Sequence, residues 1–86
     1  MINISFNFNL IEECLPPNKT PCLCLIEKRV NDILKKTYVQ SGFFENSIFW
    51  NSIYDDASGI EMESKDQVGI TTFKVVAWTT IFIKDK

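Results

Sequence analysis

Histidine is absent from this 86-residue sequence, and glycine, proline and cysteine occur only three times each. Without histidine, the chain cannot form a Ser-His-Asp or Cys-His catalytic arrangement, and it lacks the side chain used most often as a general base. Gly42, Gly59 and Gly69 are far apart in the sequence, which excludes a P-loop and a dinucleotide-binding fingerprint. We therefore expect a protein that is not an enzyme and that carries no cofactor.

Long apolar runs and a large excess of charge of one sign are also missing. No apolar segment approaches the roughly 20 residues that cross a bilayer, and residues 1–10 lack the basic start and continuous apolar stretch of an export signal. The net charge is −2, and a pI near 5.0 argues against non-specific nucleic-acid binding, which needs a basic face. We expect a cytoplasmic protein that binds neither nucleic acid nor a membrane.

The residues that are present suit a small β domain. Hydrophobic residues make up 45% of the chain and aromatic residues 13%, enough for one thin core in a single domain of residues 1–86. Strict apolar–polar alternation over residues 2–10 and a dense run of strand-forming residues over 70–83 indicate strands. We expect a mainly β fold, or α+β, with one antiparallel sheet of about five strands and at most one short helix.

The segment from residue 26 to residue 38 fits two structures. The apolar residues at helical spacing are Ile26, Val30, Ile33, Leu34 and Tyr38. A hairpin is the alternative, because Asn31-Asp32 suits a turn and residues 37–39 prefer strands. Periodicity alone slightly favours the helix. If the segment is a hairpin, we interpret the local basic patch as its solvated side; the patch consists of Lys28, Arg29, Lys35 and Lys36.

The three cysteines fit reduced thiols better than a closed disulfide framework, because their number is odd. On a strand, Cys22 and Cys24 share one face. A zinc site could use Cys14 as a third ligand, but it would then need a fourth from Glu12 or Glu13. The Cys-x-Cys spacing is also rare in zinc sites. We expect free thiols, no bound metal, and small hydrophobic side chains in a core strand.

Five of the eleven acids lie between residues 55 and 66, in a polar segment that we expect to be mostly loop. Loops carry function more often than the sheets that position them, and a negative patch attracts a basic partner in a salt-dependent way. The simpler interpretation is a solvated loop that is acidic for solubility. The expected partner-binding residues, two of them apolar anchors, are Asp55, Asp56, Ile60, Glu61, Met62, Glu63 and Asp66.

Several short motifs follow one another in the order of a known family: Phe8, Leu15-Pro16, the apolar residues 22–25, Tyr38, Phe49-Trp50 and Val76-Ala77-Trp78. Over about residues 8–79 the chain resembles the phage- and prophage-associated family called domain of unknown function 551. It departs from the family where Phe8 replaces a tryptophan, Ala77 replaces a histidine, and residues 79–83 replace a proline-bearing end. The strand expected at residues 2–6 is additional to the family pattern. The resemblance implies a hairpin for residues 26–38 and brings no activity, because the family has none assigned.

With the hairpin chosen, the expected strands are residues 2–10, 22–27, 33–39, 43–50 and 70–83, with a turn at 40–42. The expected core comprises Phe6, Phe8, Leu23, Leu25, Trp50, Val76 and Trp78. The favoured function is a small protein-binding module, encoded by a phage or mobile element, that modulates a host or phage protein. The alternative is a structural module that forms a homodimer through an exposed strand edge such as residues 70–83.

Overall fold

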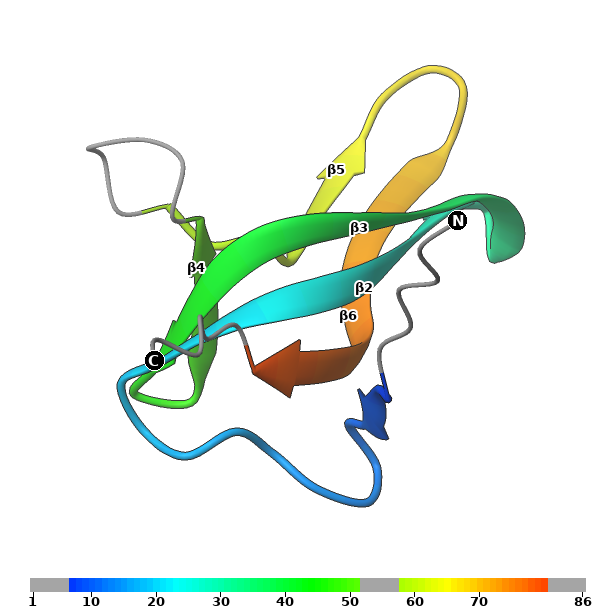
Figure 1. Cartoon of the computed structure of the whole chain (residues 1–86). Helices are drawn as coiled ribbons and strands as arrows, with labels where there is room; N and C mark the ends of the chain where they lie inside the picture. Colours follow the sequence, from blue (N-terminus) through cyan, green and yellow to red (C-terminus); the bar gives the residue numbers. More distant parts are fainter. Residues whose placement is uncertain (1–6, 52–57, 81–86) are drawn as a thin grey trace, which may run out of the picture.

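A computed structural model describes residues 7–51 and 58–80. Within these residues six strands form one antiparallel sheet and no helix occurs, so the expected mainly β fold is confirmed. The order across the sheet is β1-β6-β2-β3-β4, and β5 also pairs with β6 (Figure 1). The strands are β1 (Asn9–Leu10), β2 (Thr20–Val30), β3 (Ile33–Glu45), β4 (Ile48–Asn51), β5 (Met62–Lys65) and β6 (Ile70–Thr80). Of the strand expected at residues 2–10, the part before residue 7 lies outside the described residues, and only β1 is a strand in the rest.

The segment that fitted either a helix or a hairpin is the β2–β3 hairpin. Asn31 and Asp32 have positive φ values of 51° and 67°, as a two-residue type I′ turn requires. Val30 and Ile33 then pair across this turn. The helix favoured by periodicity is therefore wrong, because its apolar stripe is divided between two paired strands.

A second tight turn separates β3 from β4. Asn46 and Ser47 also have positive φ, and the expected strand 43–50 is consequently two strands. The turn expected at residues 40–42 is wrong, since these residues continue β3 and Gly42 pairs with Cys22. A Cβ at Gly42 would lie 2.8 Å from Ile60 Cδ1 and 3.0 Å from the Trp50 carbonyl oxygen. Glycine therefore serves a close approach at this position.

The core lies on one face of the sheet. The buried cluster consists of Cys22, Cys24, Ile26, Phe44, Phe49, Ile60, Val75 and Trp78. Trp78 confirms one expected core residue, and Phe6 lies outside the described residues. The other expected members are only partly buried, namely Phe8, Leu23, Leu25, Trp50 and Val76. The error on β2 is one of phase, because the even-numbered residues of this strand face the core and the two leucines face away.

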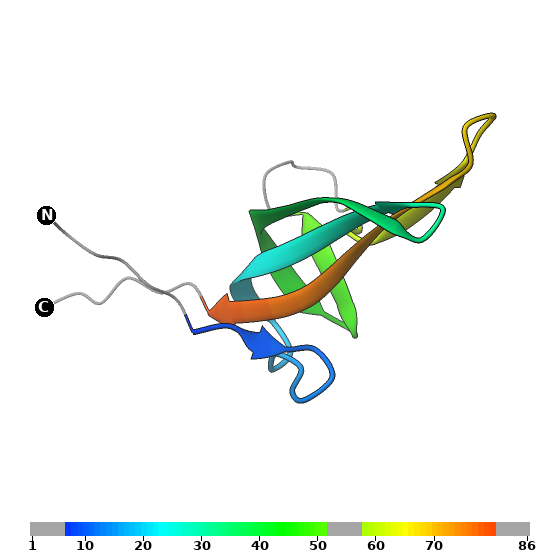
Figure 2. The same ribbon diagram turned by 90° about the vertical axis from the view of Figure 1, so that its right-hand side faces the viewer.

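The sheet is strongly twisted, and its register shifts at two places along β2. Such bulges increase the local twist. Figure 2 shows the β2–β3 and β5–β6 hairpins projecting together from the body. Asn31 joins their tips: its N–H donates to the Ile70 carbonyl oxygen (2.8 Å), and its Oδ1 accepts from the Ile70 N–H (3.0 Å). These two hydrogen bonds tie the tip of the β2–β3 hairpin to the first residue of β6, so the two hairpins are joined at their outer ends. No helix that could span a membrane is found among the described residues.

Candidate protein-docking surface

The structure divides the acidic segment that was expected to bind a partner. Asp55 and Asp56 lie outside the described residues. Ile60 is only 6% exposed and belongs to the core, so the expectation that it serves as an apolar anchor is wrong. Its side chain fills the space above Gly42. Met62, on β5, is 57% exposed and remains accessible.

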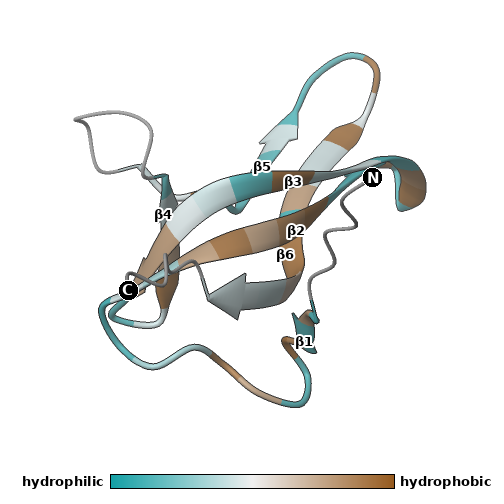
Figure 3. Ribbon diagram, in the orientation of Figure 1, coloured by the Kyte–Doolittle hydropathy of each residue, from teal (hydrophilic) through white to brown (hydrophobic). Residues whose placement is uncertain are grey.

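Two of the acids in this segment bind backbone groups of the chain itself. Glu61 Oε2 accepts a hydrogen bond from the Val75 N–H (3.1 Å). Asp66 Oδ1 accepts from the N–H groups of Val68 (2.9 Å) and Gly69 (3.2 Å), which stabilises the β5–β6 turn. Figure 3 shows the hydrophilic colour of β5 against the hydrophobic middle of β2. Binding of a basic partner by these acids, including exposed Glu63, stays a prediction.

The outer edge of β6 is covered at residues 70–73 and 76–78. β5 pairs with residues 70–73 of β6, and β1 pairs with Ala77 and Trp78. Between them, the Ile11 N–H donates to the Val76 carbonyl oxygen (3.1 Å). Self-association through the edge at residues 70–83 stays a prediction, and over residues 70–73 and 76–78 it would have to displace β5, Ile11 and β1.

The outer edge of β4 is covered as well. The Asn51 N–H donates to the Ser58 carbonyl oxygen (2.7 Å), and the Ile60 N–H donates to the Phe49 carbonyl oxygen (2.9 Å). Trp50 and Gly59 form a bridge between these two contacts. Residues 58–60 therefore act as a short additional strand along β4.

The outer edge of β3 differs, because β4 covers only its last part, from Gly42 to Glu45. Along residues 33–40, none of the described strands lies on the side opposite to β2. Glu45 flanks a two-residue turn and pairs with Ile48, so its backbone groups point toward β4. The β2–β3 register has no shift between residues 36 and 44. Alternation by twos therefore directs the N–H and C=O groups of Thr37 and Val39 outward.

Apolar and basic side chains surround this open edge. Val39 is 51% exposed, and toward the tip Ile33 is 59% and Leu34 is 46% exposed. Lys28 and Lys36 are cross-strand partners. Lys28 Nζ lies 5.7 Å from the centroid of the Phe73 ring, and Lys36 Nζ lies 5.2 Å from that of Tyr38.

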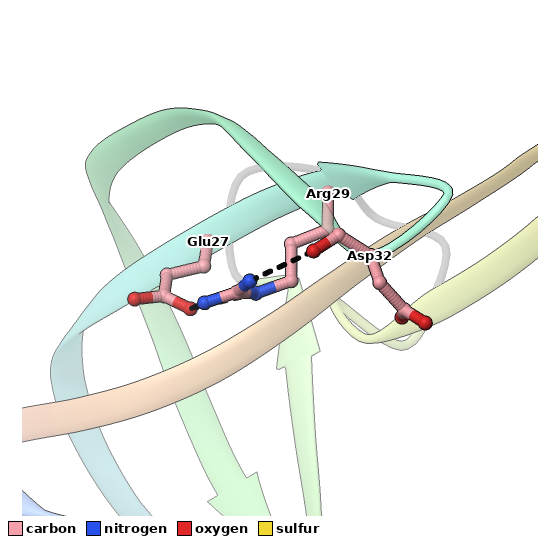
Figure 4. Close-up of polar contacts among 3 residues, drawn as sticks. All are labelled: Glu27, Arg29 and Asp32. Carbon is pink, nitrogen blue, oxygen red and sulfur yellow. Dashed lines mark hydrogen bonds and ion pairs between the residues drawn. The ribbon is translucent and has the colours of Figure 1, made fainter.

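Arg29 is the one cation with an ion pair among the described residues. Its Nη2 lies 3.0 Å from Glu27 Oε1, and its Nη1 donates to the Asp32 carbonyl oxygen at 3.2 Å (Figure 4). This pairing occupies the nearest acid on β2. Within residues 7–51 and 58–80, no acid forms an ion pair with Lys28, Lys35 or Lys36. In the sequence these lysines form a basic patch. Lysines are common on the edge strands of natural sheets, where they oppose unwanted edge-to-edge pairing.

The buried thiols of Cys22 and Cys24 share one face of β2, as expected, with their Sγ atoms 3.8 Å apart. The contact with Cys22, together with burial, raises the pKa of the Cys24 thiol, so Cys24 stays protonated at neutral pH. Cys14 is exposed, and all three cysteines are free. Among the described residues, no three potential ligands gather in a way that would hold a metal ion. Cys22 and Cys24 are fully buried and belong to the core cluster.

No family model, no curated protein and no solved structure matches the chain. The resemblance to domain of unknown function 551, with the phage origin that it implies, stays a prediction.

Proposed function

We propose that this chain is a small non-enzymatic protein-binding module that pairs an extended segment of its partner with the outer edge of β3. The observation that supports this is the open backbone of Thr37 and Val39, on a strand whose far end is already covered by β4. Such an edge takes up an added strand through main-chain hydrogen bonds, and the flanking side chains select its sequence.

The edge is held in a strand conformation before a partner binds. β3 pairs with β2 along its whole length, and Asn31 ties the hairpin tip to β6. An ordered edge lowers the entropy that is lost on binding. Val39, half exposed beside this edge, supplies apolar contact area for the added strand.

The experiment uses peptides selected from a random display library against the whole chain. Their affinity is measured for wild type and for Val39→Pro, in which proline removes the outward N–H but no hydrogen bond to β2. Val39→Thr is the matched control, since it keeps the N–H and the branched shape. We expect at least about a tenfold loss with proline, because a main-chain hydrogen bond and the strand geometry at its centre are both lost.

Two further measurements decide the interpretation. Circular dichroism melts of both variants show whether the sheet is intact. Amide exchange by NMR should slow at Thr37 and Val39 when peptide is bound. Peptides that bind Val39→Pro as tightly as wild type, or that protect other amides only, would refute strand addition at this edge.

A further inference from the structure

We infer that the segment bound along β3 alternates acidic with apolar residues, its acids lying on the face that carries Lys28 and Lys36. This inference rests on the proposed function and names the chemistry of the partner. It follows from which side chains of the β2–β3 hairpin flank the open edge, and from the contacts that these side chains lack.

The lysine face is short of negative charge. Lys28 and Lys36 lie directly opposite each other on β2 and β3, an arrangement that is unfavourable for like charges. Each ammonium group lies over an aromatic ring, and neither is paired with an acid among the described residues. Glu27, the acid next to Lys28 in sequence, lies on the opposite face of the hairpin and is bound to Arg29. An added strand would place its own side chains next to Lys36, where a carboxylate relieves the repulsion.

The opposite face of the hairpin is apolar at Val39, beside the same edge, and carries the Glu27–Arg29 ion pair nearer the tip. Val39 is the cross-strand partner of Leu25, and both are incompletely covered. Side chains of neighbouring strands that lie opposite each other share a face. A residue of the partner opposite Val39 therefore meets an apolar surface, whereas those opposite Lys36 and Tyr38 meet the lysine face. Alternation of acidic and apolar residues satisfies both faces.

Two other interpretations of the open edge are tested by the same experiment: protection of the edge by its lysines, and pairing with a second copy of this chain. Lysines on an exposed strand can prevent edge-to-edge pairing of any kind. A second copy of this chain is the alternative occupant that the experiment tests, since Glu61, Met62 and Glu63 alternate in the same manner on and beside β5. The experiment separates both interpretations from the binding of an acidic partner.

The probes are capped peptides of roughly eight residues, the length of an ordinary strand, in which valine alternates with Glu, Gln or Lys. We expect the Glu peptide to bind about five- to tenfold more tightly than the Gln peptide, and the Lys peptide to bind least, as two or three exposed charge pairs would produce. This preference should shrink as salt screens the charges. Lys36→Gln and Lys28→Gln should reduce the preference for the Glu peptide. Lys74→Gln, the same charge change at an exposed side chain of β6, should not.

The outcomes distinguish the two levels of the proposal. If Glu and Gln peptides bind equally and Val39→Pro abolishes both, strand addition stands and the acidic partner is refuted. The proposed function itself fails if none of these peptides binds and the library-selected peptides bind Val39→Pro as tightly as wild type. Sedimentation of the free chain tests the second copy: a dimer at low micromolar concentration that Val39→Pro dissociates would overturn an external partner.

Discussion

β2 and the outer half of β3 are paired with each other except at Lys35, yet they are covered very differently. β2 has β6 on one side and β3 on the other, and the side chains of Cys22, Cys24 and Ile26 are fully buried. Among the strands that the structure describes, residues 33–40 of β3 have β2 on one side only, and Ile33 and Val39 are more than half exposed. Both strands carry apolar residues along their length. The comparison shows that burial depends on what lies beside and above a strand more than on the residues that form it.

The difference separates stability from recognition. The face of β2 that carries Cys22, Cys24 and Ile26 belongs to the buried core cluster. This cluster provides the apolar burial on which the fold depends. The outer edge of β3 contributes little to that burial, and its backbone groups are available to a partner. Four changes test this division, from the largest expected effect to the smallest.

Ile26→Ala should destabilise the protein by about 3–4 kcal/mol, because it leaves a cavity at the centre of the core. Leu25→Ala, the neighbouring change on the partly exposed face, should cost less than half as much. Urea unfolding with a common m-value measures both. If Ile26→Ala prevents folding, Ile26→Val should still cost about 0.5–1.5 kcal/mol. An equal or larger loss from Leu25→Ala would reverse the face assignment of β2.

Tyr38→Pro and Val39→Pro test the direction of the backbone groups. The Tyr38 N–H points toward β2, so its removal leaves a buried carbonyl oxygen unpaired and should cost about 1–3 kcal/mol beyond Tyr38→Ala. Val39→Pro should cost less than about 1 kcal/mol beyond Val39→Ala, since its N–H points outward. Thermal unfolding of the four variants gives the comparison. Equal proline effects at both positions would contradict the open edge.

Gly42→Ala should cost about 1–3 kcal/mol, because the new methyl group meets Ile60 and the Trp50 carbonyl oxygen in a filled core. Gly59→Ala is the matched control, with no atom nearer than 3.8 Å to the added Cβ, and should stay within about 0.5 kcal/mol of wild type. Adding Ile60→Val removes the closest atom, so in chemical unfolding the double variant should lose less than the sum of the single changes.

Lys36→Gln should change the free energy of unfolding by about 0.5 kcal/mol or less, because the lysine is exposed. At low ionic strength the change should be stabilising, since it removes the repulsion with Lys28, and at high salt it should vanish. Lys35→Gln, at the neighbouring residue without a cross-strand partner, is the control. A destabilisation above about 1 kcal/mol would show that Lys36 has a structural role at this edge.

Local patterns predicted the strands better than the turns between them. The strand-forming run after Gly69 and the apolar residues after Pro21 became β6 and β2. Asn31-Asp32 was recognisable as a turn because both residues tolerate positive φ. Asn46-Ser47 was not, since it lies inside an aromatic run that fits one strand or two short ones, and nothing in the run marks where a turn would fall. The same run concealed Phe44 and Phe49, which pair across the turn with ring centroids 4.8 Å apart.

The sequence by itself determined the class of this protein: a small domain without catalytic histidine or phosphate-binding loop, built from strands whose residue preferences act over a few neighbours. It also determined that Cys22 and Cys24 lie on the same face, because side chains alternate along any strand. Only the tertiary structure decided which face is buried, through Ile60 close to Gly42 and through the cluster that Phe49, Ile60 and Trp78 form with the thiols of β2. It likewise decided which edge stays open, because β6 is covered by β5 and by the distant β1, and β4 is covered by residues 58–60. Neither property is visible in a local pattern, since both depend on which segments come to lie beside a strand.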